Sequence, residues 1–364
     1  MTNIGEAGSL STIEPKIEKT VGLTGLRAGI EPAAMINDPW AALAGLRFVL
    51  AFVVVCHHLA VFSPGFLFPC PIGLFGGFAA VLGFFMISGY SMAHSLTTDP
   101  NRLTFYERRF RRIYPLYVWG IFLPALLTAG ALLLWRHGFT PAQSTGFTDY
   151  VVALVFGNGI VRPQFVANGV LWSLCVEVLL YAASPFLLRC SYRTLVIIAA
   201  ASAVCFVAHN LFTNQEYYAE MYGASTFCLA WAFVAGFAFY RFRDKLPPTP
   251  ILATIAAGMV FAYPEMLKEP LSPLTVGGCV LIIRSLDKIK ITAAAASRLH
   301  WLGNISFCLY VVHAPVMAAA AGLHNSSALA ITAACLAAAV ASYYLVDLPT
   351  RKLVKYTGLR TARS

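Results

Sequence analysis

The sequence predicts an all-α, polytopic integral membrane protein with about ten transmembrane helices and both termini in the cytoplasm. Of the 364 residues, 59% are hydrophobic and only 12% are charged, and the mean hydropathy is +0.70. A soluble domain carries about twice this charged fraction. The apolar residues form continuous runs, and a helix needs about 20 such residues to cross a bilayer. Continuous runs argue against a membrane β-barrel, because barrel strands alternate apolar and polar residues.

Ten apolar segments are the expected spans. They cover approximately residues 40–62, 72–96, 113–135, 170–188, 194–212, 222–240, 250–264, 272–286, 300–323 and 326–348. The chain therefore divides into a mobile cytoplasmic tail at 1–38, a transmembrane domain at 39–350 and a basic cytoplasmic tail at 351–364.

Basic residues occupy one set of loops and the C-terminal tail. These residues are Arg102, Arg108, Arg109, Arg111, Arg112, Arg189, Arg193, Arg241, Arg243, Lys245, Arg284, Lys288, Lys290, Arg298, Arg351, Lys352, Lys355, Arg360 and Arg363. The alternate loops hold only Arg136, Arg162 and Lys268. Because Lys and Arg concentrate in cytoplasmic loops, the basic side and both termini are expected in the cytoplasm. The formal charge of +10 is thus explained by topology, and no nucleic-acid partner is expected.

The nine cysteines lie mostly inside apolar runs and form no Cys-x-x-Cys pair. Neither a metal site nor a disulfide framework is therefore expected. No internal repeat is evident, which weakens the interpretation of the chain as an inverted-repeat transporter.

The first expected helix contains the stretch LRFVLAFVVVCHHL at 46–59. Arg47 and His58 are eleven residues apart, which is about three turns and about 16 Å along the axis, so both point to the same face. His57 points about 100° away. Buried titratable groups in membrane helices usually face the bundle interior and mark a site. The alternative is an arginine that snorkels to the headgroups and a histidine bonded to a neighbouring backbone.

A second basic cluster lies in FYERRFRRIYPLY at 105–117, just before the third expected helix. Two interpretations are open. The arginines anchor the helix on the cytoplasmic side, or Arg109 and Arg112 belong to a phosphate clamp at a helix N-terminus, where guanidinium groups and free N–H donors meet an anion.

Three further acidic or basic residues lie within expected spans. Glu177 would lie about 10 Å below the outer surface, where a carboxylate needs a partner. Ser306, Tyr310 and His313 recur at helical spacing on one stripe. Asp347, with Arg351, closes the last helix.

In this order, the motifs resemble those of the acyltransferase-3 family of integral membrane acyltransferases. The resemblance spans about residues 40–352. It rests on Arg47 and His58, on FFMISGYSM at 84–92 with Ser88, Gly89 and Tyr90, on FYERRFRRIYPLY, on LWSLCVE at 171–177 with Trp172, Ser173 and Glu177, on LGNISFCLYVVHAPV at 302–316 with Ser306, Tyr310 and His313, and on Asp347 before the final x-Pro. Two positions depart from the common pattern, since Val178 stands where many members have a second glutamate and Asp347 replaces a glutamate.

The resemblance implies an O-acetyltransferase of the bacterial inner membrane that uses cytoplasmic acetyl-CoA and needs no metal. The acceptor would be an envelope or exported glycan or glycolipid, and the partners membrane lipids and polysaccharide-assembly proteins. Arg47, Arg109 and Arg112 would hold the CoA phosphates. His58 would act as general base, Glu177 would orient it, and His313 would be a second base or an oxyanion donor. Two alternatives stay open: a proton-coupled exporter of a glycan or lipid-linked sugar, and an inactive structural partner in polysaccharide assembly.

Overall fold

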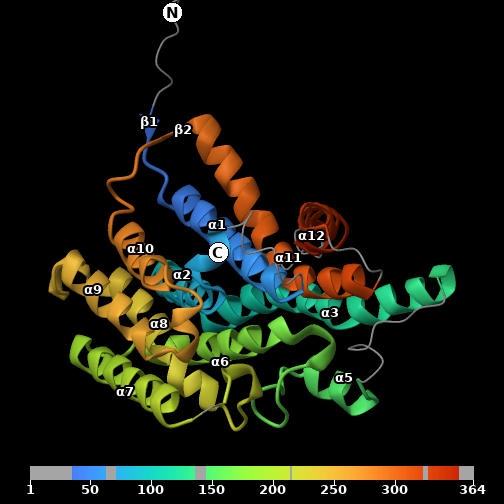
Figure 1. Cartoon of the computed structure of the whole chain (residues 1–364). Coiled ribbons are helices and arrows are strands. Elements are labelled where there is room, and N and C mark those ends of the chain that lie inside the picture. Colours follow the sequence, from blue (N-terminus) through green and yellow to red (C-terminus); the bar gives the residue numbers. More distant parts are fainter. Residues whose placement is uncertain (1–34, 63–70, 136–144, 214, 323–326, 352–364) are drawn as a thin grey trace, which may run out of the picture. The chain divides into compact units, whose positions relative to one another are not determined.

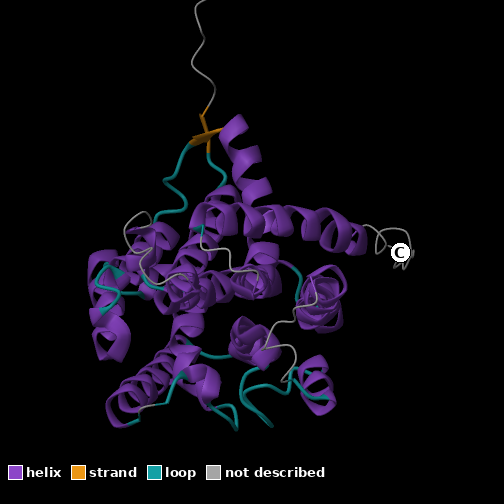
Figure 2. Cartoon of the chain, turned by 45° about the vertical axis from the view of Figure 1, so that its right-hand side comes forward, coloured by secondary structure: helices purple, strands orange, loops and turns teal. Residues whose placement is uncertain are grey.

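A computed structural model of the chain describes residues 35–62, 71–135, 145–213, 215–322 and 327–351, which are mostly helical (Figures 1 and 2). The α-helices are α1 Pro39–Phe62, α2 Gly77–Thr98, α3 Arg102–Trp135, α5 Phe147–Leu154, α6 Trp172–Leu187, α7 Tyr192–Phe212, α8 Ala224–Arg241, α9 Thr249–Met259, α10 Ser272–Arg284, α11 Ala293–Gly322 and α12 Ala328–Ser342. Short 3-10 turns lie at Pro71–Phe75, Val166–Leu171, Tyr217–Ala219, Arg243–Lys245, Val260–Ala262 and Pro264–Leu267, and a π-helical turn at Tyr343–Asp347 extends α12.

Eight helical segments in the described part of the chain are long and apolar enough to cross a membrane. Eight of the ten expected spans thus correspond to helices that are able, by length and composition, to cross a membrane. The expected spans at 250–264 and 272–286 are helical, but α9 has 11 residues and α10 has 13. Those lengths are below the roughly 20 residues that a bilayer requires. The count of ten crossings and the cytoplasmic placement of both termini stay predictions.

Several boundaries differ from those expected. Helix α3 begins at Arg102, about ten residues before the expected start. Its first turns carry the arginine cluster, whose charges interrupt the apolar run from which the start was predicted. Residues 35–38, at the end of the expected tail, are structured. Strand β1 (Met35–Ile36) pairs antiparallel with β2 (Ile291–Thr292), so the fold is all-α apart from this two-residue ladder. Residues 1–34 and 352–364, most of both expected tails, lie outside the described residues.

Helix α1 packs along α11, and α2 packs along α8. Glycines set the distance between α2 and α8. A Cβ on Gly89 would lie 1.9 Å from the carbonyl oxygen of Phe233, and a Cβ on Gly236 would lie 1.9 Å from that of Met86. Small residues allow membrane helices to approach closely, so Gly89 of the FFMISGYSM motif has a packing role.

Asn168 joins two helices at places where proline interrupts their hydrogen bonding. Pro124 in α3 and Pro315 in α11 lack an N–H and therefore leave the carbonyls four residues earlier without a helical donor. Asn168 Nδ2 donates to those carbonyls, to Gly120 O at 2.9 Å and to Val311 O at 3.0 Å. Its side chain is almost fully buried, so one amide satisfies both orphan acceptors.

The two ends of the helix bundle differ in charge. We call the end near Arg47 the arginine side and the end near His58 the histidine side. Contacts tie the basic loops together on the arginine side, where Arg243 bonds Arg284 O and Asp287, and Asn37 bonds the carbonyls of 286, 287 and 289. That this side faces the cytoplasm is still a prediction.

Candidate active site

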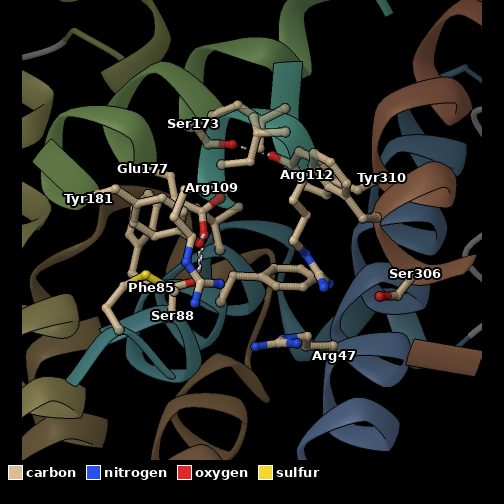
Figure 3. Close-up of a pocket in the computed structure, with 16 residues that line it drawn as sticks. Arg47, Phe85, Ser88, Arg109, Arg112, Ser173, Glu177, Tyr181, Ser306 and Tyr310 are labelled. Carbon is tan, nitrogen blue, oxygen red and sulfur yellow. Dashed lines mark hydrogen bonds between the residues drawn. The ribbon is translucent and has the colours of Figure 1, made fainter. Parts of the chain in front are cut away.

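Three adjoining cavities extend from the arginine side to the histidine side. The surface groove is lined by Trp40, Arg47, Ser91, His94, Ser95, Thr98, Asp99, Arg108 and Arg109. The arginine cavity, drawn in Figure 3, shares Arg47 and Arg109 with that groove. The histidine cavity is lined by His57, His58 and aromatic side chains, and shares Val81 and Tyr310 with the arginine cavity. Residues shared at each junction place the three cavities in series.

Three guanidinium groups face the arginine cavity. Arg47 comes from α1, and Arg109 and Arg112 come from α3, where i,i+3 spacing puts them on one face (Figure 3). Within the described residues, none of the three forms an ion pair with a carboxylate. Arg47 donates to Ser91 Oγ at 2.9 Å, and the buried Arg109 Nε has no partner.

The arginine cluster at 102–112 divides between this cavity and the surface. Arg108 pairs with Asp99 at 2.5 Å, and Arg111 pairs with Glu107 one turn away. Arg109 and Arg112 have no such partner and line the cavity. The expected clamp at a helix N-terminus is wrong in its local structure, because both residues lie inside α3. They supply cationic side chains without free backbone N–H donors.

Glu177 of α6 belongs to the arginine cavity rather than to the histidine pair. Its Oε1 accepts hydrogen bonds from Tyr181 OH at 2.6 Å and from Ser88 Oγ. The structure therefore places Glu177 with Ser88 of α2 and does not bring it into contact with His58. One carboxylate among three guanidinium groups leaves the cavity positively charged.

His58 of α1 and His313 of α11 form a pair of imidazoles. The ring centroids are 5.1 Å apart, and His313 Nε2 lies 3.3 Å from His58 Nδ1. His313 Nδ1 lies 2.8 Å from Tyr310 O, and His58 Nδ1 lies 3.0 Å from Val54 O. Carbonyl oxygens only accept, so we assign an N–H to both Nδ1 atoms. His58 Nδ1–H then faces two acceptors, and His58 Nε2 keeps the lone pair that a general base needs.

Tyr310 lies where the arginine and histidine cavities meet. Its hydroxyl is 2.6 Å from Ser173 Oγ of α6, and both hydroxyls lie 3.3 Å from Val170 O. Ser306, one turn earlier on α11, lines the arginine cavity and donates to Gly303 O at 2.8 Å. Ser306 and Tyr310 of the expected stripe thus line the cavities, and the fully buried His313 lies behind them against His58.

His57, which sequence reasoning left without a role, has a partner that this reasoning missed. Its Nδ1 lies 2.5 Å from Oε1 of Glu269, a buried carboxylate between the turn at Pro264–Leu267 and α10. The His57 and His58 rings meet edge to face, with centroids 5.1 Å apart. No local pattern marks Glu269, because it lies in a polar segment between the two shortest expected spans.

The remaining motif residues lie at the edges of these cavities or beyond them. Trp172, the first residue of α6, lines the histidine cavity. Tyr90 packs edge to face on Tyr240, with ring centroids 5.2 Å apart. Asp347 pairs with Arg351 at 2.6 Å, as expected, and lies in the π-helical turn on the arginine side.

This arrangement places three guanidinium groups toward one end of the series of cavities and a pair of imidazoles toward the other. No curated protein and no solved structure matches the chain closely enough to count as a relative. The model of one protein family, described as an acyltransferase domain, matches residues 40–347. The match covers most of the chain and extends from before Arg47 to Asp347. The chain therefore belongs to the acyltransferase-3 family and is a membrane acyltransferase.

Proposed function

We propose that this acyltransferase moves an acetyl group from cytoplasmic acetyl-CoA to a hydroxyl of an envelope or exported glycan, in the bacterial inner membrane. The observation that carries the proposal is the series of cavities, with unpaired guanidinium groups on one side and an imidazole pair on the other. An elongated donor with phosphates at one end and a thioester at the other suits such a path.

The donor end rests on Arg47, Arg109 and Arg112. Guanidinium groups bind phosphate oxygens through charge-assisted hydrogen bonds. Among the described residues no carboxylate forms an ion pair with these three groups, and the single carboxylate of Glu177 in the cavity leaves a net positive charge that suits an anion. The surface groove on the arginine side adjoins them, and the positive-inside rule predicts that this side faces the cytoplasm. Arg47 and His58 are about 16 Å apart along α1, so a donor held by the arginines must extend to reach the imidazole.

Proton transfer rests on His58. Its Nε2 takes the proton of the acceptor hydroxyl as that oxygen attacks the thioester carbonyl carbon, and His58 Nδ1–H stays bonded to Val54 O and His313 Nε2. When the carbon–sulfur bond breaks, the imidazolium returns the proton to the departing thiolate. The products are an oxygen ester and free CoA thiol, so atoms and charge balance. The hydroxyl of Tyr310, which lines the same cavity as His58 and is bonded to Ser173, is the donor assigned to the developing oxyanion.

The acceptor end rests on the histidine cavity. Besides His57 and His58 it presents Phe78, Trp172, Tyr217, Tyr218 and Tyr263. Phe78 stacks on Tyr217 and Tyr263, with ring centroids 5.1 and 4.4 Å apart. Aromatic faces beside polar groups suit a sugar ring, which has an apolar face and a hydroxyl rim.

The test compares envelope glycans of a deletion strain complemented with the native gene, His58→Ala or His300→Gln, at matched protein levels. His300 is half-exposed on the arginine side and serves as the histidine control. Loss of a general base should lower acetyl content about 100-fold or more, and the control should leave it unchanged. Undiminished acetylation in His58→Ala would remove His58 from the mechanism. A glycan that is absent from the deletion strain's surface, with no acetyl difference elsewhere, would identify an exporter instead.

A further inference from the structure

The buried carboxylate of Glu269 lies on the histidine side and takes no part in the reaction proposed above. Glu269 is only 4% exposed. Its Oε1 contacts His57 Nδ1 at 2.5 Å and the backbone N–H of Gly77 at 3.2 Å, and its Oε2 accepts from Ser272 Oγ at 3.3 Å. Gly77 begins α2, and the start of a helix favours a negative charge. Through these contacts Glu269 joins α1, α2 and the start of α10.

The backbone around this carboxylate leaves space for it and for the imidazole. Gly76 has φ +84°, and a Cβ on it would lie 2.7 Å from Glu269 Oε2 and 2.1 Å from Ser272 Oγ. A Cβ on Gly77 would lie 2.6 Å from two ring atoms of His57. A side chain at either position would clash with the imidazole of His57 or the carboxylate of Glu269, so both positions require glycine.

His57 is the partly open member of the pair. Its side chain is 34% exposed and lines the histidine cavity beside His58. Because Nδ1 is engaged by Glu269, Nε2 is the nitrogen left for a ligand. The paired carboxylate fixes the ring orientation, as it does where histidine binds a metal.

We infer that His57 binds the acceptor and that Glu269 positions His57 for this task. A hydroxyl of the sugar bonds His57 Nε2, which sets a neighbouring hydroxyl against His58 Nε2. This inference rests on the proposed function and extends it to the acceptor side, where His57 and Glu269 contribute to acceptor binding without touching the donor.

A second histidine–carboxylate pair supplies a matched control. His209 Nε2 lies 2.8 Å from Glu220 Oε1, and both side chains are largely buried near the same aromatic cluster, with exposures of 9% and 14%. Neither residue lines the histidine cavity. Glu220→Gln therefore removes a comparable carboxylate beside a histidine without replacing a residue that lines the histidine cavity, although His209 stacks on Tyr217, which does line it.

The experiment uses membranes that carry each full-length variant and their own glycan, with radiolabelled acetyl-CoA as donor. Label in the glycan is measured against acetyl-CoA concentration. His57→Gln and Glu269→Gln should lower the maximal rate about 10- to 100-fold, the effect of misplacing a reactant. Both should leave the KM for acetyl-CoA unchanged, and Glu220→Gln should leave both parameters unchanged. The purified proteins should keep the native melting temperature and its increase on addition of CoA.

Two results would overturn the inference. One is a native maximal rate in His57→Gln, which decides the matter even if Glu269→Gln does not fold. The other is a raised KM for acetyl-CoA, which would place the pair on the donor side. Failure of the proposed function looks different, because native membranes would then transfer no label and His58→Ala would match them. In that case this inference falls as well.

Discussion

Replacing Asn168 by leucine should destabilise the protein by about 2–6 kcal/mol. Leucine has a similar volume but no donor, so the carbonyls of Gly120 and Val311 would both lose their hydrogen bonds. Each buried acceptor left unsatisfied costs about 1–3 kcal/mol, and Pro124 and Pro315 exclude any helical replacement. Asn168→Asp should be worse, because a carboxylate would direct lone pairs or charge at two carbonyl oxygens.

The free energy of unfolding can be measured in mixed micelles of a mild detergent and dodecyl sulfate. Ser184→Ala is the control. Ser184 is fully buried, and its hydroxyl donates at 2.9 Å to Leu180 O, which keeps its helical N–H donor. Its loss should therefore cost only about 1 kcal/mol. If Asn168→Leu is no more destabilising than this control, the account of the two proline-freed carbonyls is refuted.

Three further changes test other parts of the structure. Arg112→Ala should raise the KM for acetyl-CoA about 10-fold or more, as expected for loss of a charge-assisted hydrogen bond. Arg111→Ala should not raise it, because Arg111 pairs with Glu107 and lines neither the surface groove nor the arginine cavity. Steady-state kinetics in membranes measure both, and equal KM values would count against the donor site. Gly89→Ala should abolish folded protein, because its Cβ would lie 1.9 Å from a carbonyl oxygen of α8, whereas Gly130→Ala meets no atom within 4 Å. Size-exclusion chromatography of detergent extracts decides this, and a native peak for Gly89→Ala would contradict the close packing. The pKa of Asp38 lies below its usual value because its carboxylate accepts a backbone N–H at the start of α1. Its stabilisation, about 1 kcal/mol for such a cap, is present above the ordinary aspartate pKa and is lost as pH falls through the lower folded value. Asp38→Ala should thus lower the melting temperature at neutral pH but not in strong acid, and a pH-independent difference would disprove this role.

Hydropathy and helical geometry predicted much of this structure. Long apolar runs must become helices in lipid, because only internal hydrogen bonds satisfy the backbone there. The spacing of Arg47 and His58 placed both on one face of α1, and both indeed line the series of cavities. Helical spacing likewise put Ser306, Tyr310 and His313 on one stripe of α11.

Other features depend on tertiary contacts that no local pattern reveals. The start of α3 was misplaced because charged residues interrupt its hydropathy, although Arg109 and Arg112 are compatible with a helix when they face a cavity. Glu177 has hydrogen-bond partners, as expected, but these are Ser88 and Tyr181 rather than His58, because α6 packs on α2.

The two residues with the most informative contacts, Glu269 and Asn168, lie in connecting segments. Hydropathy shows no periodic pattern there, so the sequence does not distinguish these residues from solvated loop residues. The prolines at 124 and 315 do indicate that two carbonyls need donors. They do not indicate that a single amide, from a turn before α6, supplies both.

The junction at Tyr310 has an electrical consequence. In the proposed reaction the acyl group passes between two compartments, and an enzyme that does this must not conduct ions. The cavities approach each other from opposite sides and share only Val81 and Tyr310. In an energised membrane most of the voltage would therefore fall across this thin layer, where a charge that crosses the full potential gains about 2.3 kcal/mol per 100 mV. In addition to its proposed role in the reaction, Tyr310 thus helps to block ion flow between the two cavities. Tyr310→Ala should therefore make the protein conduct ions in liposomes.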